Sequence, residues 1–95
     1  MAGLKTKPLP AFIKRLKSAI TDTLRDNGIA AQVDATPVPT TRLYRLAVLA
    51  PKFKELKHSE RQSLVWRITE RAISADEQMR ISMILTLTPD EVSGR

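Results

Sequence analysis

Four basic residues in the segment PKFKELKHSERQ carry the clearest chemical signal in the chain. Positively charged side chains contact phosphate groups, and several of them on one short segment can follow the backbone of a nucleic acid or an acidic protein surface. The alternative is an ordinary basic loop exposed to solvent. The candidate nucleic-acid contacts are Lys52, Lys54, Lys57 and Arg61.

Residues suited to catalysis or metal binding are scattered. The chain has no cysteine and one histidine, His58, which lies beside Lys57 and has no second histidine to act with it. No pair of carboxylates stands out for general acid–base catalysis, and Ser59 has no visible base. The three glycines are too far apart to form a phosphate-binding loop. We therefore expect a protein that is not an enzyme and has no metal or cofactor.

Length and composition predict one small domain, since 95 residues with 42% hydrophobic side chains can enclose one modest core. No run of about 18 apolar residues is present, so we expect no membrane span. The opening MAGLKTKPLP has no apolar stretch behind its lysines, and this argues against a secretory signal. The absence of cysteine fits a reducing compartment, and we expect a cytoplasmic protein. The net charge is +6, which favours an acidic partner or nucleic acid.

The elements that must position the basic segment begin with a helix. We expect residues 1–9 to form a flexible basic arm, and we place the helix from about Pro10 to Asn27. Gly28 then ends it, because glycine accepts the left-handed conformation after a helix. Apolar residues at helical spacing mark its buried face, namely Ile13, Leu16, Ile20 and Leu24.

Two strands follow, over residues 29–38 and 43–50. The short connection between them favours antiparallel pairing. In the second strand Tyr44, Leu46 and Val48 share one face, and Arg45 marks the wetter face.

The second helix is predicted from Ser59 to about Ser74, because Ser59 and Gln62 have the spacing of a capping box. Residues 75–78 are expected to be a link. The third strand is predicted over residues 80–87, parallel to the second, with Ile81, Met83, Leu85 and Leu87 on one face. A last short helix begins at the sequence Thr-Pro-Asp-Glu of residues 88–91, and residues 93–95 are expected to fray.

The predicted order is α-β-β-α-β-α, which defines an α+β fold with a three-stranded mixed sheet and helices packed on one face. Residues 10–92 form its single domain.

This order and two motifs resemble the BolA-like family. Phe53 precedes Arg61 by eight residues, as a phenylalanine precedes the family's Arg-His-Arg helix motif, and the segment from Leu87 to Val92 resembles the family's ending. The resemblance implies a fold related to the class II KH fold and a role in transcription regulation or nucleic-acid binding.

Three positions depart from the family pattern. Glu55 replaces a glycine, Gln62 replaces the histidine of the helix motif, and Arg80 replaces a histidine that opens the third strand. In the family that last histidine can help to hold an iron–sulfur cluster shared with a monothiol glutaredoxin. Arginine has no lone pair for iron; its planar fork instead suits a phosphate or a carboxylate in the neighbouring Asp76-Glu77. The Gly-x-x-Gly loop of KH domains is also missing.

Two alternatives to a nucleic-acid module therefore remain open. One is an adaptor for a glutaredoxin-type partner in iron–sulfur handling. The other is a structural domain that dimerises through the Trp66 face of the second helix, although Trp66 and Ile73 also fit the edge of a core. The oligomeric state stays open. The candidate partner-binding residues are Trp66, Ile73 and Arg80.

Overall fold

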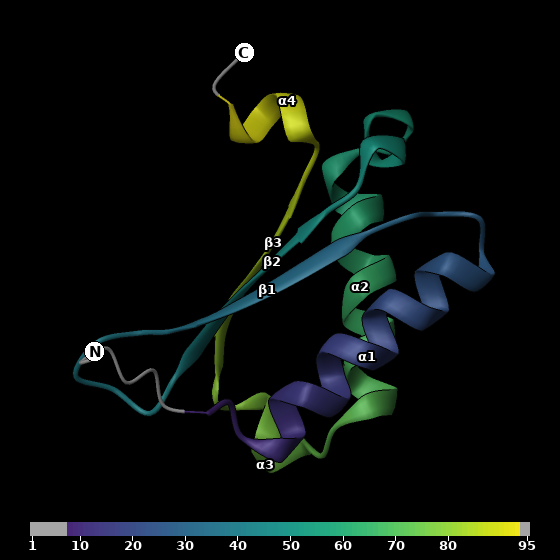
Figure 1. The fold of residues 1–95 in the computed structure, drawn as a ribbon. Helices are drawn as coiled ribbons and strands as arrows, with labels where there is room; N and C mark the ends of the chain where they lie inside the picture. The colour runs from purple at the N-terminus through teal and green to yellow at the C-terminus, as the bar shows by residue number, and fades with distance from the viewer. Residues whose placement is uncertain (1–7, 94–95) are drawn as a thin grey trace.

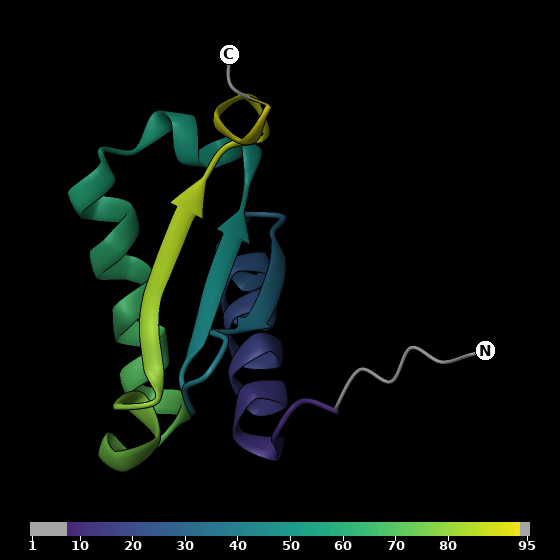
Figure 2. The same cartoon turned by 90° about the vertical axis from the view of Figure 1, so that its left-hand side faces the viewer.

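Helices cover one face of a three-stranded sheet, and the opposite face of the sheet is open (Figures 1 and 2). The computed structural model describes residues 8–93. The two long helices, α1 and α2, lie side by side behind the strands. The element bounds are α1 Ala11–Asp26, β1 Gln32–Pro37, β2 Tyr44–Leu49, the 3₁₀ helix η1 Pro51–Glu55, α2 His58–Ala72, α3 Ala75–Gln78, β3 Ile81–Leu87 and α4 Pro89–Val92.

The strand order in the sheet is β1-β2-β3, so β2 is central. β1 pairs antiparallel with β2, with Val33 opposite Val48, and β3 pairs parallel with β2, with Ile84 opposite Leu46. The predicted α+β class, mixed sheet and element order are all confirmed. The parallel pairing follows from the helical crossover between β2 and β3, which returns the chain to the end of the sheet at which β2 begins.

The end of α1 is set by glycine, as predicted. Gly28 has a φ of 78°, and Ile29 N donates to Leu24 O at 2.8 Å across the helix end. This is the Schellman arrangement, in which the residue after the glycine still caps the helix. Because Ile29 is engaged in this way, β1 begins only at Gln32, and the predicted start of the first strand at residue 29 is wrong.

The buried core lies between the sheet and the helix pair. Its α1 residues include the four predicted ones, and β2 contributes Leu46 and Val48 from the predicted face. β3 differs from the prediction. A register shift near Tyr44 and Arg45 puts Ile81 in the core together with Ile84, while Met83 and Leu85 are 44% and 37% exposed on the open face.

The start of α2 also differs from the prediction. The helix begins at His58 with Lys57 as its N-cap, and Glu60 Oε1 accepts a hydrogen bond from Lys57 N at 2.8 Å. The predicted pairing of Ser59 with Gln62 does not form, because Gln62 donates to β3 instead.

The two short helices are closed by local hydrogen bonds. Ser74 Oγ accepts from Glu77 N, and this turns the predicted link into α3. Thr88 Oγ1 accepts from Glu91 N at the start of α4, where the sequence predicted a helix. Most of the predicted arm of residues 1–9 and of the predicted frayed end lies outside the described residues. Within residues 8–93, no helix has the length and apolar character needed to cross a membrane.

Candidate nucleic-acid interface

Three exposed lysines lie on the segment that connects β2 to α2, which we call the lysine corner. Lys52 and Lys54 belong to η1, and Lys57 caps α2. Pro51 begins η1, where its missing N–H costs no hydrogen bond because the first N–H groups of a helix have no partner within the helix. Phe53 lies between the first two lysines in sequence but is fully buried, so η1 is fixed to the core by one ring and turns its lysines outward. The three lysines are therefore neighbours on one exposed segment.

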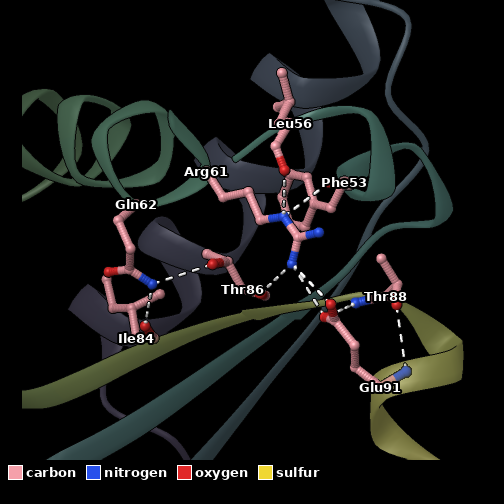
Figure 3. Close-up of polar contacts among 8 residues, drawn as sticks. All are labelled: Phe53, Leu56, Arg61, Gln62, Ile84, Thr86, Thr88 and Glu91. Carbon is pink, nitrogen blue, oxygen red and sulfur yellow. Dashed lines mark hydrogen bonds and ion pairs between the residues drawn. The ribbon is translucent and has the colours of Figure 1, made fainter. Parts of the chain in front are cut away.

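Arg61 lies beneath this segment, with only 4% of its surface exposed (Figure 3). Its Nε donates to Phe53 O at 2.7 Å and to Leu56 O at 3.2 Å. The guanidinium carbon lies 5.8 Å from the centroid of the Phe53 ring. One side chain of α2 thus holds both the ring and the backbone of the basic segment.

The other end of the same guanidinium reaches β3 and α4. Arg61 NH1 donates to Thr86 O at 3.3 Å and pairs with Glu91 Oε1 at 3.0 Å. The predicted place of Arg61 on the exposed contact surface is therefore corrected, because a buried guanidinium with these partners cannot reach a phosphate in solution. The exposed basic set is reduced to the three lysines.

The carboxylate of Glu91 is suited to this partner. Its pKa lies below the ordinary value, first because Thr88 N donates to it and then because of the guanidinium of Arg61, with a smaller contribution from His58; partial burial opposes these effects. Glu91 therefore stays ionised near neutral pH. The same carboxylate caps α4 and neutralises the buried arginine, which connects α4 to the corner.

Gln62 extends this polar contact along β3. Its Nε2 donates to Ile84 O at 2.9 Å and to Thr86 Oγ1 at 3.1 Å (Figure 3). Leu87 O accepts from Ala50 N, so by strand alternation the carbonyls of Ile84 and Thr86 point away from β2. Gln62 and Arg61 thereby cover the two outward carbonyls at this end of an edge strand, which hinders the addition of another strand there.

The electrostatics of the corner are positive at its surface. Among residues 8–93, no ion pair is formed by Lys52, Lys54 or Lys57. Glu55 is the one exposed acid of η1, and Glu60 in α2 is turned to the backbone of its own N-cap. The first N–H groups of a helix of 15 residues lie at the same place and add positive potential. The corner can therefore attract an anion with several negative charges.

His58 lies exposed at the first position of α2. Among the described residues, no three side chains of the metal-binding types gather at a common point.

The predicted partner residues are separated from this corner. Ile73 is only 6% exposed and belongs to the core, so its prediction as a partner-binding residue is corrected; Trp66 is half-buried against the same core. Both fit the core-edge alternative, since their side chains pack inward from the end and flank of α2.

Arg80 lies at the opposite end of β3 from the lysines. Its Nε donates to Arg42 O at 3.1 Å, and its guanidinium carbon lies 5.0 Å from the centroid of the Phe12 ring and 5.6 Å from that of Tyr44. The predicted carboxylate partner in the Asp76-Glu77 segment is not used, because Glu77 pairs with Arg15 at 3.0 Å. Seven strand residues, about 23 Å of extended chain, separate the two ends.

One signal in the sequence could have revealed the burial of Arg61. Arg61, Val65 and Ile68 are spaced by four and three residues, which puts the arginine on the inward stripe of α2. The partner Glu91 had no such signal, because it is 30 residues away.

The chain matches no protein-family model and has no significant sequence match among curated proteins. Its function is therefore inferred from the residues and their geometry. That geometry combines a buried arginine anchor with an exposed lysine surface.

Proposed function

We propose that this protein is a BolA-like binding module without enzymatic activity, which contacts the phosphate backbone of a nucleic acid through Lys52, Lys54 and Lys57. The α-β-β-α-β-α order supports the assignment, as do the spacing of Phe53 and Arg61 and the Thr-Pro-Asp-Glu start of the last helix. Regulation of transcription is the role that the family resemblance implies for such a module.

The observation that carries the proposal is the way in which the lysine segment is held. Arg61 fixes the carbonyls of Phe53 and Leu56, one in η1 and one just after it. A segment held in this way loses little backbone freedom when it binds, so more of the interaction free energy remains for binding. An ordinary flexible basic loop lacks such an anchor, and this difference favours a contact surface.

The test replaces the three lysines together by glutamine, which removes their charge and keeps their approximate size. Binding to a short DNA duplex and to a single-stranded RNA is measured by fluorescence anisotropy over a range of salt concentrations. Because each phosphate contact releases counterions, losing three contacts should reduce the log–log salt slope on the duplex by roughly 2–3 units. Circular dichroism should show an unchanged fold.

A matched control variant changes three exposed bases elsewhere, Lys14, Arg42 and Arg45, to glutamine. It has the same net charge as the lysine variant, so general electrostatic attraction falls equally in both. A larger loss for the lysine variant supports the corner. Equal losses, or no binding by the wild type at low salt, would refute the proposal.

The adaptor alternative is tested at position 80. Arg80 has five donors and no lone pair for iron, and its Nε is already bonded to Arg42 O. Wild-type protein mixed with a cluster-loaded monothiol glutaredoxin should leave the visible absorption and circular dichroism of the glutaredoxin unchanged. A new heterodimer signature that disappears in Arg80→Ala would instead establish the adaptor and show that it requires the side chain at position 80.

A further inference from the structure

A hollow of about 350 Å³ lies between α1 and α2, away from the lysine corner. Its floor is aliphatic, with Ala19 from α1 and Leu64, Ile68 and Ala72 from α2. Such a hollow can accept one or two aliphatic side chains of another molecule.

The hollow continues toward the start of α2. A second hollow of about 330 Å³ is lined by α2 alone; it shares Leu64 and Arg67 with the first and reaches Ser59, Glu60 and Ser63. From Ser59 to Ala72 the combined groove follows α2 for about 20 Å. This length corresponds to several turns of a bound helix, so the groove is more extended than a site for a small molecule.

Two arginines, Arg67 and Arg71, line the hollow. Both are exposed, and neither forms an ion pair within residues 8–93. They are four residues apart on one helix, where like charges destabilise the helix by a few tenths of a kcal/mol. The other three α-helical arginines of the described chain outside this groove, at positions 15, 25 and 61, all have carboxylate partners. Glu60 also lines the groove, but its carboxylate accepts a hydrogen bond from Lys57 N at the start of α2, so neither Arg67 nor Arg71 has a carboxylate partner among the described residues.

We propose that the α1–α2 groove binds an acidic amphipathic helix of a partner protein. Aliphatic side chains of that helix fill the hollow over Leu64 and Ala72, and two carboxylates spaced by one helical turn pair with Arg67 and Arg71. Successive guanidiniums four residues apart rise by about 6 Å, which matches acids at positions i and i+4 of the partner. Arginine also suits this role because its fork binds carboxylate in a bidentate manner.

The chemistry of the floor favours this occupant over the alternatives. Within the described residues, no aromatic side chain lines the hollow to stack a base. A second copy of the chain has the same net charge of +6 and would bring further positive charge to the arginines. The groove begins at Ser59, next to the lysine corner, but it uses other side chains and does not depend on the nucleic-acid proposal.

The test uses a synthetic helical peptide that presents a leucine stripe and two glutamates four residues apart. Binding to the full chain is followed by amide chemical shifts in NMR titration. The expected shifts centre on Ala19, Leu64 and Ala72. The double variant R67Q/R71Q should bind the peptide about tenfold more weakly or worse, because two charge-assisted hydrogen-bond pairs are lost.

Two controls separate charge from shape. The same peptide with glutamines should bind the wild type as weakly as the glutamate peptide binds R67Q/R71Q. The variant Ala19→Trp, which fills the floor, should block binding while both arginines remain, and R42Q/R45Q should bind normally. No shifts at millimolar peptide, shifts centred elsewhere, or equal binding by R67Q/R71Q would overturn the proposal. So would a selective loss of nucleic-acid binding in R67Q/R71Q with the peptide affinity unchanged.

Discussion

Arg61 and Arg80 serve opposite ends of β3, and each places its guanidinium over an aromatic ring. At the carboxyl end of the strand, Arg61 is buried and donates to three carbonyls and one carboxylate. At the amino end, Arg80 is half-exposed, and its Nε donates to one carbonyl in the β1–β2 connection.

The difference shows that burial and hydrogen-bond partners decide which of two roles an arginine has. A guanidinium out of water must have its charge and its donors satisfied, and Arg61 therefore has partners in three separate segments, namely η1 with its C-cap, β3 and α4. A guanidinium at the surface can lie flat on rings and leave the rest of its fork to solvent. The Arg61 end of the sheet should therefore be held by polar contacts, and the Arg80 end by ring packing.

The largest expected effect comes from Arg61→Met, which keeps the aliphatic bulk and removes the donors. The carbonyls of Phe53 and Thr86 lose a donor and Glu91 loses its counter-ion, so we expect the free energy of unfolding to fall by about 3–5 kcal/mol. Urea denaturation measures this change in the free energy of unfolding. Arg67→Met, on the exposed side of the same helix, should stay within about 0.5 kcal/mol. If Arg61→Met lowered the free energy of unfolding less than Arg80→Met does, the contrast between the two ends of β3 would be wrong.

The second effect concerns the carbonyls of β3. Gln62→Ala removes the donor to Ile84 O and to Thr86 Oγ1, and we expect a loss of about 1–2 kcal/mol. Amide hydrogen exchange should rise selectively in β3, since this end of the strand loses its cover. Unchanged exchange in β3 would show that Gln62 contributes nothing to closing the edge.

Arg80→Met should cost less, about 1 kcal/mol, because it removes one partly exposed hydrogen bond and the contacts over Phe12 and Tyr44. Arg45→Met, on the open face of the sheet, is the matched control and should be close to neutral. A loss above about 3 kcal/mol would mean that Arg80 is as essential as Arg61 and would remove the contrast between the two ends.

The smallest effect is a pH dependence shared by the two ends. Glu91 and Glu77 both have a pKa below the ordinary value of 4.5, and in each the first cause is a backbone N–H, from Thr88 and Ser74 respectively. A carboxyl group whose pKa is lower in the folded than in the unfolded state stabilises the folded state at pH values above its unfolded-state pKa. That contribution is lost as the pH falls through the folded pKa, so unfolding should become easier below about pH 4.5.

The two carboxyl groups can be separated by Glu91→Gln and Glu77→Gln, each followed by urea denaturation over a pH series. Glu91→Gln should remove more of the acid dependence, because protonated Glu91 leaves the buried Arg61 without its counter-ion, whereas Arg15 beside Glu77 is well solvated. Equal effects would show that the backbone hydrogen bonds alone set both pKa values.

Local patterns were sufficient to predict most of the fold. The apolar spacing of α1, its end at Gly28, the antiparallel β1–β2 pair and the start of α4 at Thr88 each depend on residues close in sequence. The start of α2 was misplaced because two overlapping capping signals compete there. Glu60 bonds to Lys57, and Gln62 is drawn to β3.

The order of elements, the strand pairing and the clustering of Lys52, Lys54 and Lys57 could all be read from the chain alone, since periodicity, turn residues and charge are local properties. The folded structure was needed to reveal that Arg61 turns inward, that Glu91 meets it, and that Arg67 and Arg71 line a groove beside α1. The physical reason is that the cost of burying a charge depends on partners brought together across the fold, and those partners lie 25 and 30 residues away.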